Sequence, residues 1–349
     1  MTEDDAVNEE RRERLEQRSL YCLSPSRITN THFVQRYRIT KDAFYFLCDT
    51  LRTHTDLRSS QRINLETKVL CALLFFANGD YQRVVGIANH FSQEAISKYI
   101  AQVTKALNHP NILQTFIKFP NTREARDLVK QRFYNSYGIP GVVGCIDGCH
   151  FRIFKPRKEE EHLFYCRKHY HSLNVLMVCD DNCRIMYINP KFGGASHDAF
   201  VWENSHINNY LQTLHRSGES VWLLGDSGYP QRPWLMTPYS NPAAGSAAET
   251  YNNVHSKARV VIENTFGRLK NRWRCVCKDR VLHYKPEKCA QIIIACSVLH
   301  NLALDFTVPL PSNEMFGNQQ FYRTEIPEEE DQSLLSLGRI IRDRLASRL

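Results

Sequence analysis

The chain has 349 residues, which is enough for two or three domains of ordinary size and a sizeable core. Hydrophobic residues make up 42% of it and charged residues 23%, a composition that excludes a disordered, fibrous or disulfide-scaffold protein. The formal net charge of +8 matters mainly through where the basic residues gather.

The first 20 residues are charged throughout and lack the apolar core of a secretory signal, and residues 1–28 are predicted to form a flexible tail. The longest apolar runs, at 69–77 and 292–299, are far shorter than the roughly 18 to 20 residues that a membrane span needs. We therefore expect a soluble intracellular protein without membrane contact.

Residues 29–136 carry apolar side chains at three- and four-residue spacing, which predicts an all-α region. Within it, residues 81–107 predict two helices joined by a tight turn, with Ser92 capping the second helix. The buried stripe of that second helix is predicted to consist of Ile96, Ile100, Val103 and Leu107.

Such a helix pair has two interpretations. In a DNA-binding helix-turn-helix, the amino-terminal residues of the second helix enter the major groove, which would assign DNA contacts to Gln93, Ser97 and Lys98. The alternative is an ordinary pair of helices in an all-α bundle.

Residues 137–304 change to short β-type runs interspersed with helices, which predicts an α/β domain with a mixed sheet flanked by helices. The predicted strands are 141–147, 150–155, 172–179, 184–189 and 221–226. The predicted helices are about 197–215, 255–275 and 286–304. The first strands lie close enough in sequence to form hairpins. Residues 305–349 predict an irregular segment followed by a C-terminal amphipathic helix.

Two of the apolar strands run out into an aspartate, Asp147 after GVVGCI and Asp226 after VWLLG. If these strands are parallel neighbours, both carboxylates lie at the same edge of the sheet, where open α/β sheets bind ligands. Two adjacent carboxylates repel unless a cation lies between them. Mg²⁺ is the natural candidate because it prefers oxygen ligands and retains waters for phosphate substrates.

A third carboxylate, Glu263, lies in a predicted helix beside an unusual concentration of positive charge. Residues 251–285 hold nine Lys or Arg against two acids, which suits a polyanion such as nucleic acid. At 100° per residue, the cations within about 40° of Glu263 on the helix are Arg259, Lys270 and Arg274. The simpler interpretation of Arg259 and Glu263 is an ordinary helix salt bridge.

Asp198, in the loop sequence GGASHDAF, is a fourth candidate. It lies where a helix is predicted to begin, so a role at the helix dipole competes with a role as a ligand. The twelve cysteines form no CxxC pair, which favours reduced, mostly buried thiols over disulfides or zinc. The local zinc alternative is Cys166 with His169 and His171.

Four segments in order, CIDGCH, SHDAFVWENS, GDSGYP and IENTFGRLKNRWR, resemble the Harbinger (PIF/Harbinger) transposase-derived nucleases, a branch of the DDE transposase superfamily. The resemblance covers at least residues 140–304. It implies a ribonuclease H-like fold, a mixed five-stranded sheet flanked by helices. The implied catalytic acids are Asp147, Asp226 and Glu263, with Asp198 as an additional metal ligand.

The resemblance implies an endonuclease that cleaves DNA with two divalent metal ions, Mg²⁺ or Mn²⁺. It also implies a separate Myb- or trihelix-like DNA-binding partner and a location in nucleus and cytoplasm, and it is compatible with an oligomer.

Two other interpretations stay open. The chain could be a domesticated, catalytically silent DNA-binding or adapter protein, or a metal-dependent phosphatase acting on small molecules, which the basic helix disfavours.

Overall fold

The computed structural model describes residues 25–80, 82–88, 91–311 and 332–349. The chain divides into two compact units. Unit 1 consists of the residues up to Phe116 together with Lys270–Val281 and Gln291–Glu314. Unit 2 consists of Ile117–Leu269, Leu282–Ala290 and Met315–Leu349. No helix within the described residues has both the length and the apolar character that crossing a membrane requires.

Unit 1 is helical, as the sequence predicts for this region. Its elements are η1 (Pro25–Arg27), α2 (Asn30–Tyr37), α3 (Lys41–His54), α4 (Leu65–Asn78), α5 (Gln82–Ala88), α6 (Gln93–Leu107), α7 (Pro110–Phe116) and η2 (Arg274–Val276). The central helix is α4, which is buried on nearly every side. Side-chain caps begin several of these helices, Thr40 at α3 and Asn64 at α4 among them.

The predicted helix pair is present as α5 and α6. Ser92 caps α6 by accepting a hydrogen bond from the Ala95 N–H at 3.2 Å, as predicted. The predicted stripe of α6 is buried, from Ile96 through Ile100 and Val103 to Leu107. Residues 81, 89 and 90, at the start of α5 and in the turn, lie outside the described residues, as do the tail residues 1–24 and the segment 312–331.

Unit 2 is built on a five-stranded mixed sheet of order β3-β2-β1-β4-β5. The strands are β1 (Val142–Arg152), β2 (Ser172–Cys179), β3 (Ile185–Gly193), β4 (Trp222–Leu224) and β5 (Leu235–Met236). β1 pairs antiparallel with β2 and parallel with β4, and β5 extends the parallel half. This arrangement confirms the predicted fold class and is consistent with a ribonuclease H-like fold.

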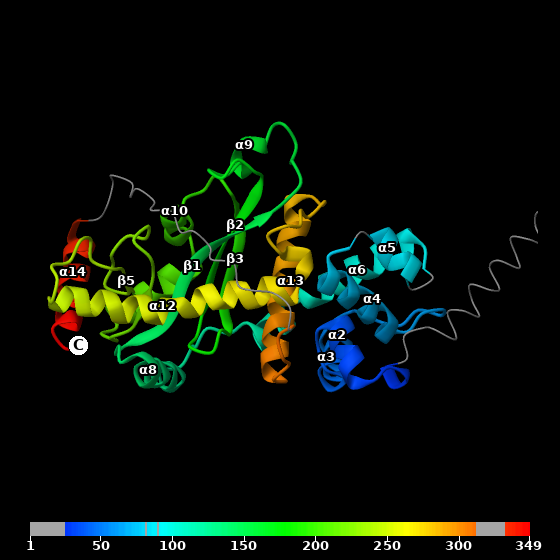
Figure 1. Ribbon diagram of the computed structural model, residues 1–349, viewed down its shortest axis with the longest axis horizontal. Helices are drawn as coiled ribbons and strands as arrows, with labels where there is room; N and C mark the ends of the chain where they lie inside the picture. The colour runs from blue at the N-terminus through cyan, green and yellow to red at the C-terminus, as the bar shows by residue number, and fades with distance from the viewer. Residues whose placement is uncertain (1–24, 81, 89–90, 312–331) are drawn as a thin grey trace, which may run out of the picture. The chain divides into compact units, whose positions relative to one another are not determined.

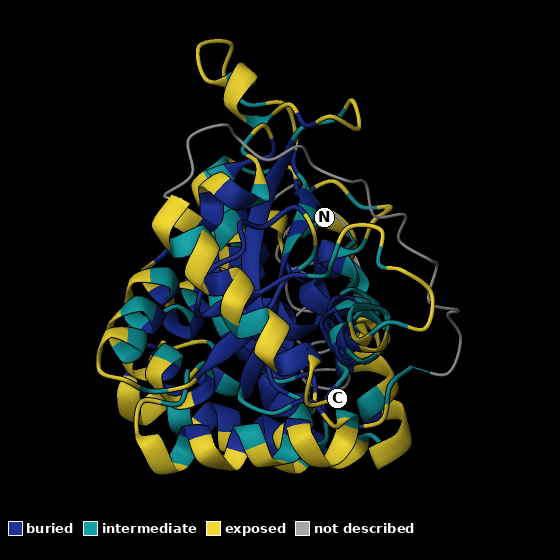
Figure 2. Cartoon of the chain, turned by 90° about the vertical axis from the view of Figure 1, so that its left-hand side faces the viewer, coloured by how far each residue is buried: buried dark blue, intermediate teal, exposed yellow. Residues whose placement is uncertain are grey.

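Helices cover both faces of the sheet (Figure 1). The helices of unit 2 are α8 (Arg123–Tyr137), α9 (Glu161–Phe164), α10 (Asp198–Glu203), α11 (His206–Arg216), α12 (Ala247–Arg272), which belongs to unit 1 from Lys270 on, and α14 (Gln332–Ala346). α13 (Pro286–Asp305) begins in unit 2 and belongs to unit 1 from Gln291 on. One face packs Ile146, Leu176 and Val178 against α10 and α11. On the other face, Cys145 Sγ lies 3.4 Å from the Ala258 carbonyl of α12. β2, β4 and β5 are therefore wholly buried, β1 is mostly buried and the edge strand β3 is partly buried, whereas the outward sides of the helices are exposed (Figure 2).

Several predicted boundaries are wrong. Residues 141–147 and 150–155 are not two strands of a hairpin, because β1 continues through Gly148 and stays paired with β2 from Cys145 to Arg152. The fifth strand is instead β5, whose two residues are too short to show a pattern in the sequence. The helix predicted over 197–215 breaks in two where Ser205 caps α11.

The ends of the long basic helix also differ from the prediction. α12 begins at Ala247, earlier than expected, and ends at Arg272 instead of continuing to 275. Arg274 was predicted to share the helical face of Glu263. It lies instead in the short helix η2, so this prediction is wrong. The predicted C-terminal helix is confirmed as α14.

Candidate active site

The register of the parallel strands β1 and β4 brings two predicted aspartates level with each other. Cys145 and Leu224 are partners across the two strands, and β4 ends at Leu224. Asp147 and Asp226 each follow two residues after one of these partners. Because side chains two residues apart on an extended chain share a face, the two carboxylates lie side by side.

Asp147 lies inside β1, not at its end as the sequence suggested, and only 3% of it is exposed. One of its oxygens, Oδ1, accepts a hydrogen bond from the Gly148 N–H at 2.8 Å. Asp226 is partly buried beyond β4, and its Oδ1 accepts from the Gly228 N–H at 2.9 Å. Both carboxylates are therefore held by the backbone of their own segment.

Asp198 joins them from the first turn of α10. Its Oδ1 accepts a hydrogen bond of 2.8 Å from the amide of Asn174, a β2 residue that also donates to the Ser196 carbonyl at 3.0 Å. The backbone of Gly148 provides the room, since a Cβ at this position would lie 2.0 Å from Asp198 Oδ1. Asn174 and Gly148 thus fix where the Asp198 carboxylate lies.

The charges of these three aspartates act on one another. Burial raises the pKa of Asp147 to about 8, the guanidinium of Arg259 opposes this shift, and the charges of Asp226 and Asp198 reinforce it. Burial also raises the pKa of Asp198, against the hydrogen bond from Asn174, and Asp226 adds to the shift. Such a cluster favours either a proton or a cation.

Arg259 of α12 is the cation that the chain itself supplies. Its Nη2 donates to Asp147 Oδ2 at 3.0 Å, and its side chain is only 12% exposed. Its Nε is buried without a hydrogen-bond partner among the described residues. The sequence pointed to Arg259 as a partner of DNA or of Glu263, whereas the structure pairs it with Asp147 across 112 residues of chain.

Glu263 lies one turn further along α12 and is partly buried. Burial raises the pKa of its carboxyl group, and the nearby charge of Arg259 lowers it. Neither Asp147 nor Asp226 is among the causes of this pKa shift of Glu263. The structure therefore brings together Asp147, Asp198 and Asp226, and it connects Glu263 to them only through Arg259.

The fit of this cluster to a divalent metal can be judged from its donors. Its ligand atoms are all oxygens, the kind that Mg²⁺ and Mn²⁺ prefer. Two further oxygens, Asn174 Oδ1 and the Tyr229 hydroxyl, are buried without hydrogen-bond partners within the described part of the chain. Among the described residues, no three His, Cys, Asp or Glu side chains stand close enough to hold an ion as they are. The chemistry of these donor atoms fits a divalent metal ion. The positive charge paired with Asp147 in the structure is the guanidinium of Arg259.

The remaining predicted residues belong to unit 1, whereas the acidic cluster belongs to unit 2. Lys270, in the last turn of α12, and Arg274, in η2, both belong to unit 1. Gln93, Ser97 and Lys98 are exposed on the first turns of α6, also in unit 1. The structure thus leaves the α6 residues accessible to a partner.

Sequence reasoning missed several residues of the site. Asn174 and Tyr229 are buried beside the aspartates, and a polar residue inside the apolar run SLNVLMVC was a usable signal for the first. Arg167 and Lys168, whose charges lower the pKa of Asp198, lie in the exposed loop before β2. Arg167 also contacts the His197 ring at 2.8 Å.

The loop that holds Arg167 contains the zinc alternative. Cys166 is buried and free, whereas His171 Nε2 lies 3.1 Å from Glu161 Oε1 and His169 packs on the ring of Tyr165. No cysteine within the described residues forms a disulfide, and all of them but Cys277 are buried.

The chain is similar to several known proteins. Residues 146–301 match a family described as DDE superfamily endonuclease, and residues 27–109 match a domain of unknown function. HARBI1 of Homo sapiens, named as a candidate nuclease, is 36% identical over 315 residues, 89% of this chain and 87% of that protein. HARBI1 of Xenopus laevis is 33% identical over 290 residues, 82% of this chain and 81% of that protein.

A plant relative is more distant. The Arabidopsis thaliana protein Antagonist of Like Heterochromatin Protein 1 is 24% identical over 294 residues, 78% of this chain and 73% of that protein. No solved structure matches the chain.

Proposed function

Because the chain belongs to the Harbinger transposase-derived nuclease family, we propose that it is a divalent-metal-dependent endonuclease that hydrolyses phosphodiester bonds of DNA. The observation that supports this most is the acidic cluster. Asp147 lies in β1, Asp226 lies two residues beyond the adjacent parallel strand β4, and the charges of Asp226 and Asp198 both act on Asp147. Three carboxylates with a single guanidinium between them are a costly arrangement for stability alone.

In this proposal, Asp147, Asp198 and Asp226 hold the metal, with Glu263 as a further ligand. Two bound Mg²⁺ or Mn²⁺ ions would supply an activated water and stabilise the leaving oxygen. Asn174 orients Asp198, and Gly148 leaves space for its carboxylate. Arg259 neutralises Asp147 when no metal is bound, and Glu263, one turn away, is near enough to receive the guanidinium afterwards.

DNA contacts are proposed on two surfaces. Beside the aspartates, Arg167 and Lys168 lie in an exposed loop with Tyr165, and Phe200 is exposed on α10. Basic and aromatic side chains of this kind bind phosphates and stack on bases. In unit 1, the first turns of α6 offer Gln93, Ser97 and Lys98 as contacts of a helix-turn-helix.

The remaining expectations stay proposals of the same kind. A Myb- or trihelix-like DNA-binding partner would bring the chain from cytoplasm to nucleus and to its target. The name of the Arabidopsis relative refers to a heterochromatin protein, which is compatible with a function at chromatin.

The test is nicking of supercoiled plasmid by the purified full-length protein, with Mn²⁺ or Mg²⁺ against EDTA. We expect metal-dependent nicking that Asp147→Asn lowers by about 100-fold or more, the scale of losing one electrostatic catalytic group. The control is Asp127→Asn, which removes an exposed carboxylate of α8 and should nick like the wild type.

Equal nicking by the wild type and Asp147→Asn would assign the activity to a contaminant and overturn the proposal. DNA binding without nicking at any metal concentration would favour the catalytically silent, DNA-binding interpretation instead.

A further inference from the structure

Unit 1 contains a pocket of about 730 Å³ that none of the predicted activities uses. Its ten lining residues come from three segments: the helix α2, the end of α12 with η2, and the chain that follows α13. They are Asn30, Thr31, Val34, Gln35, Arg38, Asn271, Arg274, Pro309, Leu310 and Pro311. Two are arginines, four carry an amide or hydroxyl group, and none is acidic.

A buried arginine, Arg272, joins the segments that line the pocket by hydrogen bonds. Arg272, 3% exposed, donates to the carbonyl oxygens of Arg38 at 3.1 Å, Pro309 at 3.3 Å and Val308 at 2.8 Å. This guanidinium, which belongs to the end of α12, therefore binds the backbone of the other two segments. The pocket is a built feature of unit 1, not a chance gap between loops.

Arg38 is placed there against the preference of its backbone. It ends α2 with φ at 62°, in the left-handed region that favours glycine or asparagine at a helix end. An arginine at this position costs about 1 kcal/mol of stability through backbone strain, which a glycine would avoid. A side chain retained at such a position is a reason to look for what it binds.

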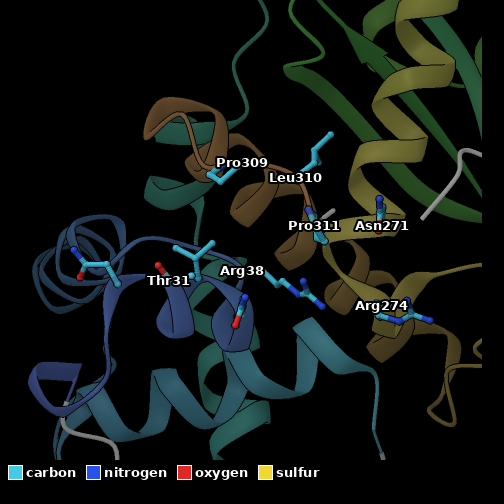
Figure 3. A pocket seen from close by; sticks show the side chains of 10 residues that line it. Thr31, Arg38, Asn271, Arg274, Pro309, Leu310 and Pro311 are labelled. Carbon is cyan, nitrogen blue, oxygen red and sulfur yellow. The ribbon is translucent and has the colours of Figure 1, made fainter. Parts of the chain in front are cut away.

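Arg38, at the end of α2, and Arg274, in η2, both line this pocket (Figure 3). The Nε of Arg38 is buried and has no hydrogen-bond partner among the described residues. Burial lowers the pKa of Arg38, and the positive charge of Arg274 lowers it further. Two positively charged side chains in a lining that contains no acid favour the binding of an anion.

We propose that this pocket binds a backbone phosphate of DNA, at a site separate from the acidic cluster. Guanidinium groups match the geometry of phosphate oxygens, and Asn30, Gln35 and Asn271 add amide donors. The rim formed by Val34, Pro309, Leu310 and Pro311 offers apolar surface to a sugar. The choice of DNA over an acidic protein segment rests on the proposed function.

The experiment measures binding of the full chain to a short fluorescent DNA duplex by anisotropy, in EDTA so that cleavage cannot occur. Arg38→Asn is the main variant, because asparagine accepts the left-handed backbone and should leave the melting temperature unchanged or higher. We expect DNA affinity to fall about tenfold and the slope of log affinity against log salt to fall by about 1. Arg274→Gln should behave alike.

The matched control is Arg36→Gln, which removes the same charge from the same helix outside the pocket lining. A second arm adds inorganic phosphate at constant ionic strength. Phosphate should raise the melting temperature of the wild type but not that of Arg38→Asn. Equal losses of DNA affinity in Arg38→Asn and Arg36→Gln would overturn the inference.

A third arm replaces DNA by a labelled hexaglutamate peptide. Peptide binding that depends on Arg38, together with DNA binding that does not, would assign the pocket to an acidic protein segment and overturn the inference. The proposed nuclease function fails separately, when the wild type binds DNA through Arg38 yet does not nick it with metal.

Discussion

At the scale of single residues, Gly148 is the position where the site tolerates least. A Cβ there would lie 2.0 Å from Asp198 Oδ1 and 2.9 Å from Asn174 Oδ1. Because Asp198 can swing aside, we expect Gly148→Ala to fold. Its nicking rate should fall about 100-fold, the cost of a displacement of about 1 Å at a reacting centre.

A double-mutant cycle checks the cause of that loss. If Gly148→Ala acts by moving Asp198, it should cost little more in an Asp198→Asn background than Asp198→Asn costs alone. Losses that multiply in the double variant would show that the two positions act independently.

The sequence pointed to the acidic residues because their chemistry is visible in the pattern. An apolar run that ends in an aspartate is unusual, and two of them indicated that Asp147 and Asp226 face one ligand. The partner of Asp147 was not visible, because Arg259 lies 112 positions away and its only near acid in sequence is Glu263. Pairing across the sheet depends on register, which no local pattern contains.

At the scale of elements, α8 is tied to the rest of unit 2 by a buried ion pair. Arg126 donates from Nε to Glu219 Oε1 at 2.9 Å and from Nη1 to the Tyr210 hydroxyl at 3.0 Å, and the side chains of the ion pair are 5% and 10% exposed. Arg126→Met should lower the free energy of unfolding by about 3 kcal/mol, because it leaves Glu219 buried without its main partner. The matched control is Arg52→Met, which removes an exposed pair with Asp49 and Glu66 and should cost about 0.5 kcal/mol or less.

Urea unfolding at several pH values completes this prediction. The hydrogen bond from Arg126 lowers the pKa of Glu219 in the folded state. The pair therefore stabilises the fold fully above the ordinary glutamate pKa, and this contribution is lost as the pH falls through the lower, folded value. The difference between the wild type and Arg126→Met should shrink below about pH 4. A difference that stays constant down to pH 3 would contradict the assignment.

Element types were easier to predict than element ends. The helical stripe of α6 and the apolar strands followed from periodicity, which burial reproduces. The join of two predicted strands into β1 did not, since Gly148 and His150 resemble a turn, yet Gly148 serves the close approach of Asp198. The two-residue strand β5 exists only because β4 offers it a partner.

At the scale of the whole molecule, the compact units do not follow the order of the sequence. Unit 1 contains residues 270–281 and 291–314 in addition to its amino-terminal helices. Asn301 donates to the Phe116 carbonyl at 2.8 Å, and Asn108 donates to the Gln291 carbonyl at 2.9 Å. The turn after α4 packs so closely that a Cβ on Gly79 would lie 2.9 Å from Cys275.

A fragment of residues 25–116 should therefore fail to fold by itself, although a sequence-based boundary near residue 136 suggests an independent helical region. We expect far-ultraviolet circular dichroism to show helix without a cooperative thermal transition, as in a compact but loosely packed state. The intact chain is the comparison. A sharp, reversible transition in the fragment would refute this dependence on the later segments.

In the proposed function, the pairing of Arg259 with Asp147 separates two demands that metalloenzymes usually combine, holding a metal ion and folding. A cluster of ligand acids that neutralises one of its members internally needs no ion in order to fold. Loss of the ion, or of the reaction, then carries little penalty in protein abundance. Descendants of such an enzyme can fall silent and persist as intact proteins, free to acquire a different use.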